Sequence, residues 1–330
     1  MTKLEELASL LKGKKVVIQT HDFPDPDAIG AAFGLQYLLS TKGIETKIVH
    51  FGNFDKRTLR LTTDLFHITT INAAFYEGSE DDFVINIDGQ KNNANFSDLI
   101  GNEIACIDHH QWVSDYKYAF VDHRIVGACS SIIALYFKEN NIAVPTDVAS
   151  ALLYGIKIDT LNFTKGVTDT DISAFGILNP EADQSLLLRL DSNELGLDDL
   201  RAYGAAIQNL HAKDGIGFVH IPFDCPDRLV AMVSNFILSL DCVVLSVVYA
   251  DRDGGMKFSI RSENSDLNAG DLIRVALEGI GDGGGHPMIA GGVIFPDGME
   301  KLGNDTDTAI RQLFFDTYEK MKAKSSSTPA

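Results

Sequence analysis

Four short segments in the first half of the chain combine aspartate and histidine with a neighbouring apolar run. They span residues 21–28, 85–89, 106–110 and 155–160. Aspartate and histidine ligands without cysteine suit manganese, magnesium or iron and argue against a structural zinc site. Two such ions about 3.5–4 Å apart, bridged by a carboxylate, generate a hydroxide and hold the attacking and leaving oxygens of a phosphoryl group. The residue types therefore predict two-metal hydrolysis of a phosphoester.

Single residues in these segments also have interpretations that need no metal. Asp27 could serve only as the N-cap of the helix that follows it, and Asp88 could simply end a strand. Asp159 is harder to explain, because a carboxylate at the C-terminal end of a helix opposes the helix dipole unless a cation is near. The adjacent His109 and His110 after a short apolar run are uncommon by chance. Buried carboxylates gathered in one place would repel one another unless metal ions neutralised them, which favours the metal site.

The elements around these segments predict that the segments meet. Short apolar runs predict strands, and runs with helical spacing between them predict helices. Ligands of an open α/β sheet gather beyond the carboxyl ends of its strands, where the first three segments fall. The predicted fold class is therefore α/β, with a mostly parallel N-terminal sheet and helices on both faces. The predicted strands are 15–20, 46–50, 83–87 and 104–107, and the predicted helices are 28–40, 130–140 and 147–158.

The second half predicts a smaller α/β domain across a cleft from the first. Residues 181–211 are helix-like without a strand signal, so we expect the last helices of the first domain and a connector there. The predicted boundaries are a catalytic domain over 1–190, a helical connector over 191–212 and a substrate-binding domain over 213–330. The elements predicted for this domain are strands 216–221, 243–250, 256–261 and 290–295 and helices 227–239 and 269–278.

The composition predicts a cytoplasmic protein that does not bind long nucleic acid. The 330 residues are 45% hydrophobic, no apolar run reaches the ~18 residues of a membrane span, and the N-terminus lacks a secretory pattern. A formal net charge of -18 opposes binding of a long duplex, which depends on Lys and Arg neutralising phosphates. A few local cations and metal ions still permit binding of short nucleotides. We therefore expect neither a membrane nor a long duplex as a partner.

The cysteines carry no sign of chemistry. They are widely spaced, lie in apolar stretches and show none of the paired spacings of a zinc or redox motif. We expect all of them to be reduced core residues: Cys106, Cys129, Cys225 and Cys242.

The four segments resemble the motifs of the DHH phosphoesterase superfamily. The first motif corresponds to His21-x-x-Pro24-Asp25-x-Asp27-Ala28, and the others to Asp88, Asp108-His109-His110 and Asp159. The resemblance continues in the second half, where residues 258–262 and the run Gly283-Gly284-Gly285-His286 look like the glycine-rich substrate domain of one subgroup. That subgroup includes bacterial nanoRNases, which are oligoribonucleases, and linear-dinucleotide phosphodiesterases.

The resemblance implies a ligand set for two Mn²⁺ ions, with Mg²⁺ or other divalent ions as alternatives. One ion would be held by His21, Asp25 and Asp88, and the other by Asp27, Asp88, His109 and Asp159, with Asp88 bridging. Asp108 would orient a histidine, as carboxylates commonly do beside metal sites. His110 would lie beside the phosphoryl group and stabilise developing charge or the leaving oxygen.

The resemblance also implies substrate contacts. Arg261 would bind a terminal phosphate through two hydrogen bonds, and Ser262 would add a hydroxyl. Backbone N–H groups of Gly283, Gly284 and Gly285 would approach a phosphate or base closely, with His286 pointing into the cleft. The alternative for residues 281–285 is a flexible loop without a binding role. Two departures from the family pattern, Asp282 and Pro287, could reshape this end of the site, and Arg124 with Ser130 and Ser131 could supply one more phosphate contact.

The predicted function is hydrolysis of short oligoribonucleotides and of linear dinucleotides, such as pGpG or pApA, to mononucleotides. A pyrophosphatase of this superfamily would carry a different second domain, and the large exonucleases carry additional domains. A cyclic dinucleotide phosphodiesterase and a 3′-phosphoadenosine 5′-phosphate phosphatase are the enzymatic alternatives. A nucleotide-binding regulator is the non-enzymatic one, but it would require a missing ligand, and all ligand positions are Asp or His. We expect a monomer or a homodimer.

Overall fold

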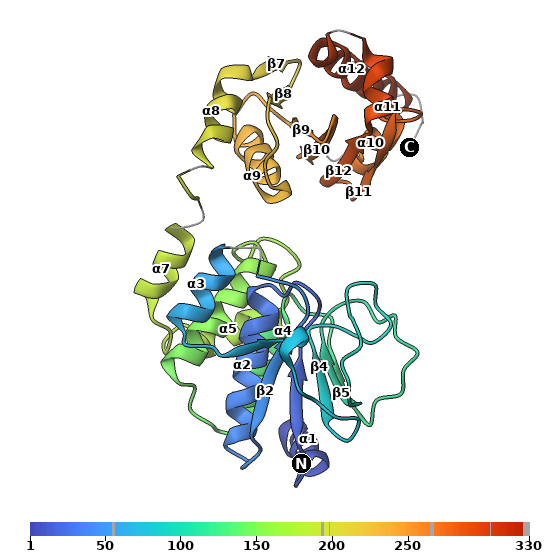
Figure 1. Cartoon of the computed structure of the whole chain (residues 1–330). Helices are drawn as coiled ribbons and strands as arrows, with labels where there is room; N and C mark the ends of the chain where they lie inside the picture. The colour runs from blue at the N-terminus through green and yellow to red at the C-terminus, as the bar shows by residue number, and fades with distance from the viewer. Residues whose placement is uncertain (55–56, 193–194, 198, 265–266, 304, 326–330) are drawn as a thin grey trace. The chain divides into compact units, whose positions relative to one another are not determined.

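The computed structural model divides into two compact units. It describes residues 1–330 except 55–56, 193–194, 198, 265–266, 304 and 326–330. The units are Met1–Glu194 and Leu195–Ala330, and each contains its own six-stranded sheet (Figure 1). None of the helices that the structure describes is long and apolar enough to span a membrane.

The sheet of the first unit is entirely parallel. Its strand order is β3-β2-β1-β4-β5-β6, so β1, β4 and β5 lie side by side in its centre. The predicted α/β class, with a parallel sheet flanked by helices, is confirmed. The strands are β1 (Val16–Gln19), β2 (Thr46–His50), β3 (Thr70–Asn72), β4 (Phe83–Ile87), β5 (Asn102–Asp108) and β6 (Phe120–His123).

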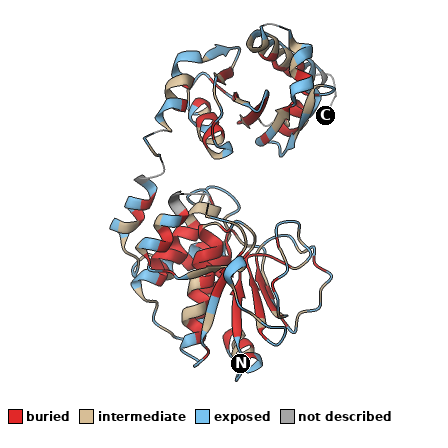
Figure 2. Cartoon of the chain, viewed as in Figure 1, coloured by how far each residue is buried: buried red, intermediate tan, exposed pale blue. Residues whose placement is uncertain are grey.

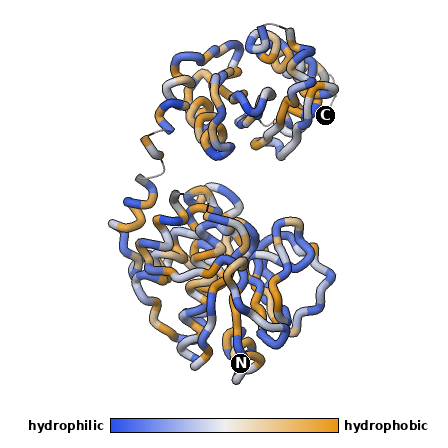
Figure 3. Tube along the Cα trace, viewed as in Figure 1, coloured by the Kyte–Doolittle hydropathy of each residue, from blue (hydrophilic) through white to orange (hydrophobic). Residues whose placement is uncertain are grey.

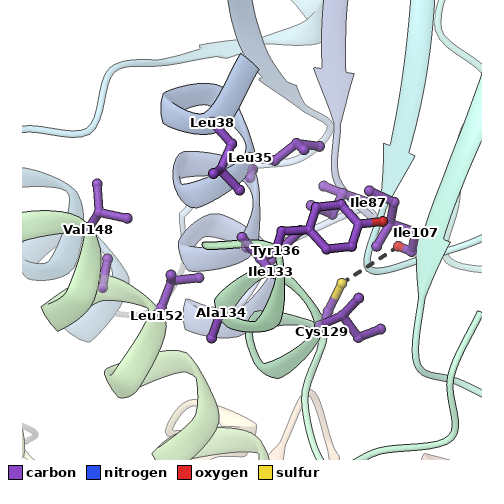
Figure 4. Close-up of a cluster of buried hydrophobic side chains, with 14 of the residues drawn as sticks. Leu35, Leu38, Ile87, Ile107, Cys129, Ile133, Ala134, Tyr136, Val148 and Leu152 are labelled. Atoms are coloured by element: carbon purple, nitrogen blue, oxygen red, sulfur yellow. Dashed lines mark hydrogen bonds between the residues drawn. The ribbon is translucent and has the colours of Figure 1, made fainter. Parts of the chain in front are cut away.

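Helices pack on one face of this sheet and form the larger core. The apolar side chains of α2 and α5 meet those of α4 and of the central strands, as Figure 4 shows for Leu35, Ile107 and Leu152. A smaller cluster on the opposite face joins Val17 and Val84 of the strands to Leu99. The helices are α1 (Lys3–Leu11), α2 (Pro26–Ser40), α3 (Arg57–Leu65), α4 (Cys129–Glu139), α5 (Thr146–Asp159), α6 (Asp169–Leu178) and α7 (Gln184–Ser192), with the 3₁₀ helix η1 (Ala73–Phe75) after β3.

The sheet of the second unit is mixed. Its order is β11-β12-β10-β9-β8-β7, and β8 and β9 are parallel while all other neighbours are antiparallel. Helices α8 and α9 pack on one face and α10 and α12 on the other. The strands are β7 (His211–Lys213), β8 (Ile216–Ile221), β9 (Leu245–Arg252), β10 (Gly255–Ser262), β11 (Gly281–Gly285) and β12 (Ile289–Ile294), and the helices are α8 (Leu200–Asn209), α9 (Asp227–Leu238), α10 (Ala269–Ala276), α11 (Pro296–Met299), η2 (Glu300–Leu302) and α12 (Thr306–Ser325).

Burial and hydropathy follow the same layers in each unit. Buried residues concentrate in the strands and on the inner sides of the helices (Figure 2), and apolar residues concentrate in the same places (Figure 3). Three of the cysteines are buried, as expected, but Cys242 is exposed, which corrects the prediction that all four are core residues. Cys242 follows α9 in the short turn that leads to β9, where the chain returns to the surface.

Two regions of the second half differ from the expectation. Residues 281–285 form the edge strand β11, paired with β12, and not a loop. The segment 191–212, expected as a connector, contains α8 and the start of β7, which both belong to the second unit; its residues 193–194 and 198 lie outside the described part of the chain.

Candidate metal centre

The sequence segments that carry aspartate and histidine converge at one edge of the parallel sheet. The loop after β1 contains His21, Asp88 follows β4 directly, and Asp108 ends β5. Because β1, β4 and β5 are neighbours and run in the same direction, their carboxyl ends bring these segments together. Asp159, the last residue of α5, joins them from the helical layer.

The donor atoms lie close enough to share cations. Three groups each offer one ligand atom per residue within 4.8 Å of one another. All six predicted metal ligands belong to these groups, and Asp88 occurs in two of them. The groups are His21 with Asp25 and Asp88, Asp27 with His109 and Asp159, and Asp88 with His109 and His110.

His109 lies at the centre of the carboxylates. Its Nε2 is 3.2 Å from Oδ1 of Asp88 and 3.3 Å from Oδ2 of Asp159. The Nδ1 atom on the other side of the ring contacts the carbonyl oxygen of Val126 at 3.0 Å. A carbonyl accepts only, so Nδ1 carries the hydrogen and a neutral His109 presents the Nε2 lone pair to the carboxylates, as a metal ligand requires.

His21 has the same arrangement on the other side of Asp88. Its Nδ1 contacts the carbonyl oxygen of Asp22 at 2.9 Å, and its Nε2 is 3.7 Å from Oδ2 of Asp88. Each of the two histidines therefore turns its second nitrogen toward one oxygen of the same carboxylate. This geometry suits a carboxylate that is shared between two cations.

Backbone amides fix Asp25 and Asp27. Oδ1 of Asp25 accepts from the N–H groups of Asp27 at 2.9 Å and Ala28 at 3.0 Å, so Asp25 is the N-cap of α2. The two oxygens of Asp27 accept from the N–H groups of Cys129 at 2.7 Å and Ser130 at 2.9 Å, at the start of α4. Asp27 is therefore not the N-cap of α2, the helix that follows it. Its carboxylate instead caps α4, which starts about a hundred residues later in the sequence.

The turn after β4 is made by Asp88 itself. Asp88 has φ of 56°, whereas Gly89 is not in the left-handed region, so the glycine is not needed for the turn. A Cβ on Gly89 would lie 2.5 Å from the ring of Phe96. Gly89 is needed because the Phe96 ring packs directly on its backbone.

The electrostatics of the cluster call for positive charge. Burial, and then the negative charge of Asp88, raise the pKa of Asp25, and the same causes raise the pKa of Asp27 further. Burial alone would lower the pKa of His109, but the nearby carboxylates of Asp159 and Asp88 outweigh burial and raise the pKa to about 12. Burial alone would raise the pKa of Asp88, and His109 reverses that direction. The raised pKa values mean that the cluster binds protons more tightly than isolated side chains do. A divalent cation would supply the same positive charge in place of those protons.

Two buried atoms support the fit of a cation. Oδ1 of Asp88 and Nε2 of His109 are both shielded from solvent and make no hydrogen bond with the residues that the structure describes. An unsatisfied buried polar atom is costly, and a ligated one is satisfied. Oxygen and imidazole donors without a thiolate suit Mn²⁺ or Mg²⁺. The residues present therefore fit divalent cations.

A buried hydrogen-bond chain holds His110. Asp108 accepts from Nδ1 of His110 at 2.9 Å, and this bond raises the pKa of the His110 imidazole. The other oxygen of Asp108 accepts from Nε2 of Gln90 at 2.6 Å. Oε1 of Gln90 in turn accepts from the N–H groups of Val113 and Ser114. Sequence reasoning missed Gln90, and the one signal for it was its place two residues after Asp88.

Arg124 and the serines after it have other partners. The guanidinium of Arg124 donates to both oxygens of Asp122, at 2.8 and 2.7 Å. The Asp122 side chain is buried, and that of Arg124 is partly exposed. Ser130 and Ser131 are buried at the start of α4. The predicted phosphate contact of Arg124 would require it to leave the Asp122 carboxylate.

The second unit has a cavity of about 500 Å³. It contains four of the residues predicted to bind substrate, namely Arg261, Gly284, Gly285 and His286. Arg252 and Lys257 line the same cavity and were not predicted. A volume of a few hundred Å³ is typical of small-molecule sites.

The floor of this cavity is bare backbone. Gly284 of β11 pairs with Gly291 of β12, and a Cβ on Gly284 would meet no described atom within 4 Å. Gly283 faces the other way, because its Cβ would lie 2.8 Å from the side chain of Ile273 in α10. Ser262 is also buried, and its Oγ accepts from the N–H group of Asn264. Gly283 and Ser262 thus support the fold and do not line the cavity.

Arg261 differs from the other cations at the wall of this cavity, because among the described residues it pairs with no carboxylate. It donates to Asn235 at 2.9 Å and to its own neighbours Ser259 and Ile260, but to no carboxylate among the described residues. Burial lowers the pKa of its guanidinium. An anion in the cavity would offset that desolvation.

Comparison with known proteins gives matches to both units. Residues 15–156 match the model of the DHH family, N-terminal domain, and residues 218–312 match that of the DHHA1 domain. An uncharacterized protein of Methanocaldococcus jannaschii is 27% identical and aligns over 94% of this chain and 67% of its own length. A probable manganese-dependent inorganic pyrophosphatase of Enterococcus faecalis is 32% identical and aligns over 57% of this chain and 60% of its own length.

The fold itself recurs in a solved structure. An exopolyphosphatase-related protein from Bacteroides fragilis superposes with a TM-score of 0.74, covering 98% of both chains at 20% sequence identity. At that identity the likeness establishes the fold. The two family models together match more than half of this chain, and its acidic and histidine segments fall within the first of them. The chain belongs to the DHH phosphoesterase family, with a DHHA1 domain following its DHH domain.

Proposed function

We propose that this protein is a divalent-metal-dependent phosphodiesterase that hydrolyses short oligoribonucleotides and linear dinucleotides to mononucleotides. The observation that carries the proposal is the cluster of Asp and His donors at the carboxyl edge of the parallel sheet. Mn²⁺ is the proposed ion, supported by relatives named as probable manganese-dependent pyrophosphatases. The ligands would be His21, Asp25 and Asp88 for one ion and Asp27, Asp88, His109 and Asp159 for the other.

The bound ions would supply charge neutralisation at the phosphoryl group and activation of the attacking water. The residues of the chain then have separate tasks. Asp88 and His109 would help to hold the ions, and the backbone amides of α4 hold Asp27 in place. His110 is half exposed, with its Nδ1 bound to Asp108. Its Nε2–H is therefore available to donate to a phosphoryl or leaving oxygen, and Asp108 favours the protonated ring that can do so.

The cavity of the second unit supports a nucleotide rather than a bare phosphate. Arg252 and Lys257 of its lining form ion pairs with Asp227, and Lys257 also pairs with Asp224, so Arg261 is the lining cation that pairs with no carboxylate among the described residues. Its glycine floor lets a flat base or a phosphate approach the backbone. A volume of about 500 Å³ exceeds what an inorganic phosphate fills. Arg261 would pair with a phosphate through its planar guanidinium.

Hydrolysis of inorganic pyrophosphate is the competing proposal, because several relatives carry that name. Against it stands the DHHA1 match over residues 218–312, which includes the whole glycine-floored cavity. Pyrophosphate has no sugar or base that would use this cavity. The two proposals share their metal chemistry and differ in substrate.

The test is a substrate panel. The protein is stripped with a chelator, reloaded with Mn²⁺, and given linear diribonucleotides, longer RNAs, cyclic dinucleotides, 3′-phosphoadenosine 5′-phosphate and pyrophosphate. We expect the fastest initial rates for the linear dinucleotides and the shortest RNAs. Fastest turnover of any other member would contradict the proposed substrate. Asp25→Ala and His109→Ala should abolish turnover, whereas Asp64→Asn, at an exposed aspartate of α3, should not change it.

A further inference from the structure

One exposed aromatic residue lies inside the metal-binding loop. Phe23 is two residues from both His21 and Asp25, in the loop that joins β1 to α2. Its side chain is 62% exposed. Its backbone is in the left-handed region, with φ of 52°.

The requirements of folding do not explain a phenylalanine at this position. A bulky residue at positive φ is a steric outlier, and such strain commonly marks a functional site. The exposed ring also gains little from burial. Leu161, which is exposed and has φ of 47°, differs because it lies in the left-handed turn that ends α5, a common place for positive φ. Glycine or asparagine would suit the backbone at position 23 better than phenylalanine does.

The Phe23 ring is braced on one side. A Cβ on Gly52 would lie 2.5 Å from Cδ1 of the ring, so the ring packs directly against the Gly52 backbone. The N–H of Phe23 donates to the carbonyl of Phe51 at 3.0 Å. Nδ2 of Asn72 donates to the carbonyl of Gly52 at 2.7 Å and holds this support in place. Together the ring and its support form what we call the Phe23–Gly52 shelf.

We propose that the Phe23–Gly52 shelf is a stacking site for the nucleobase next to the scissile phosphate. This inference rests on the proposed function. A phosphate bound at His21 and Asp25 has its nucleoside attached directly, and Phe23 is the exposed aromatic residue between these two side chains in the loop. Every nucleobase has a π face, so a phenylalanine selects for nucleotides without selecting one base. The shelf thus selects substrates that carry a base, and the metal centre hydrolyses them.

The test compares substrates and variants. Linear dinucleotides with both bases are compared with analogues in which one base is replaced by hydrogen. Phe23→Ala should lower kcat/KM for the complete dinucleotide roughly ten- to a hundredfold, the loss expected for one stacked base. It should leave kcat/KM nearly unchanged for the analogue that lacks the stacked base. Phe23→Trp should retain activity, and Gly52→Ala should reduce it by displacing the ring.

Stability separates binding from a structural role. Phe23→Gly relieves the strain at φ of 52°, so its thermal midpoint should equal or exceed that of the wild type while kcat/KM falls. A drop in midpoint that parallels the drop in activity would overturn the proposal. Phe295→Ala serves as the matched control, because Phe295 is 49% exposed in the second unit and does not line the cavity there.

A second readout does not depend on the identity of the substrate. Guanosine 5′-monophosphate and ribose 5-phosphate are compared as inhibitors of whichever phosphoester the wild type hydrolyses. The wild type should bind the nucleotide more tightly, and Phe23→Ala should remove that preference. If the wild type hydrolyses no dinucleotide, the proposed function fails and the inhibitor ratio alone decides the shelf. An equal ratio in wild type and Phe23→Ala overturns the shelf.

Discussion

At the scale of single residues, hydrogen bonds to the backbone decide which atoms face the metal centre. Carbonyl oxygens occupy Nδ1 of both His21 and His109, so the Nε2 atoms are left for cations. Backbone N–H groups occupy the carboxylates of Asp25 and Asp27 and fix their directions. The donors are therefore positioned before any ion binds, which reduces the reorganisation that binding requires.

Gln90 should be needed for both stability and turnover. Gln90→Leu removes the donor to Asp108 and the acceptor for Val113 and Ser114, all of them in a buried network. We expect a loss of about 1–3 kcal/mol in the free energy of unfolding. Because Asp108 then holds His110 less firmly, kcat should fall more than KM rises, in kinetics with Mn²⁺.

The matched control for Gln90 is Gln36→Leu. It also removes a side-chain donor, here to the carbonyl of Thr46, at a site away from the metal cluster. It should change stability without the selective loss of kcat. Equal effects of the two substitutions on kcat would contradict a positioning role for Gln90.

The metal-free protein should lose stability as the pH rises. The pKa of His109 is raised from 6.5 to about 12 in the folded state. Between those values the folded state keeps a proton that the unfolded state has released, so stability falls with increasing pH. The raised pKa values of Asp25 and Asp27 act in the same direction above their ordinary value of 3.8.

This pH dependence can be measured with chelator present, by following thermal unfolding from about pH 6 to about pH 8. The fluorescence of Trp112 is a suitable probe, because it is the one tryptophan of the chain and lies in the first unit. Mn²⁺ replaces the proton, so it should raise the midpoint more at the higher pH. A metal-free midpoint that increases with pH would show that the sign is wrong.

At the scale of elements, glycines let α2 and α5 approach closely enough to support the metal centre. A Cβ on Gly155 of α5 would lie 2.9 Å from Cα of Asp27 in α2, and one on Gly30 would lie 2.7 Å from the carbonyl oxygen of Ala151. Both contacts are with backbone, which cannot rotate away. The helices that carry Asp27 and Asp159 are therefore held at a separation that only glycine permits.

Gly155→Ala should weaken both folding and metal binding. The added methyl group would push α5 away from α2 and overpack the core, at a cost of about 1–3 kcal/mol in the free energy of unfolding. Since Asp159 ends the same helix, the affinity for Mn²⁺, measured by calorimetric titration, should fall as well.

Gly176→Ala is the control for Gly155→Ala. Gly176 also lies inside a helix, α6, but a Cβ there would meet no described atom within 4 Å. Its substitution should stabilise slightly, by about 0.5–1 kcal/mol, because alanine favours a helix over glycine. Similar destabilisation by both substitutions would exclude the close helix contact as the cause.

At the scale of the whole molecule, the metal ions should stabilise one unit and not the other. The proposed ligands all lie within Met1–Glu194, and each unit has its own hydrophobic core. A ligand stabilises only the cooperative unit that binds it. We expect calorimetry to resolve two transitions, of which Mn²⁺ shifts the one that Trp112 fluorescence also reports. A single transition in which both signals shift together would contradict independent units.

The sequence by itself determined the elements and residue types that local patterns encode. Strands β2, β4 and β8 have the predicted bounds, because short runs rich in β-branched and aromatic residues mark strands. The aspartates and histidines could be found because three of the segments follow predicted strands, whose parallel arrangement brings their ends to one edge. Their role as ligands stays a prediction that metal titration can test.

Only the tertiary structure decided the contacts between residues that are distant in sequence. Asp27 caps α4 rather than its own helix, and Gln90 bonds to Asp108 eighteen positions later. The run at 281–285 is a strand because β12 pairs with it, although glycine carries no local preference for a strand. Hydrogen bonds and close packing depend on positions in space, and no local pattern of residue types records which partner the folded chain supplies.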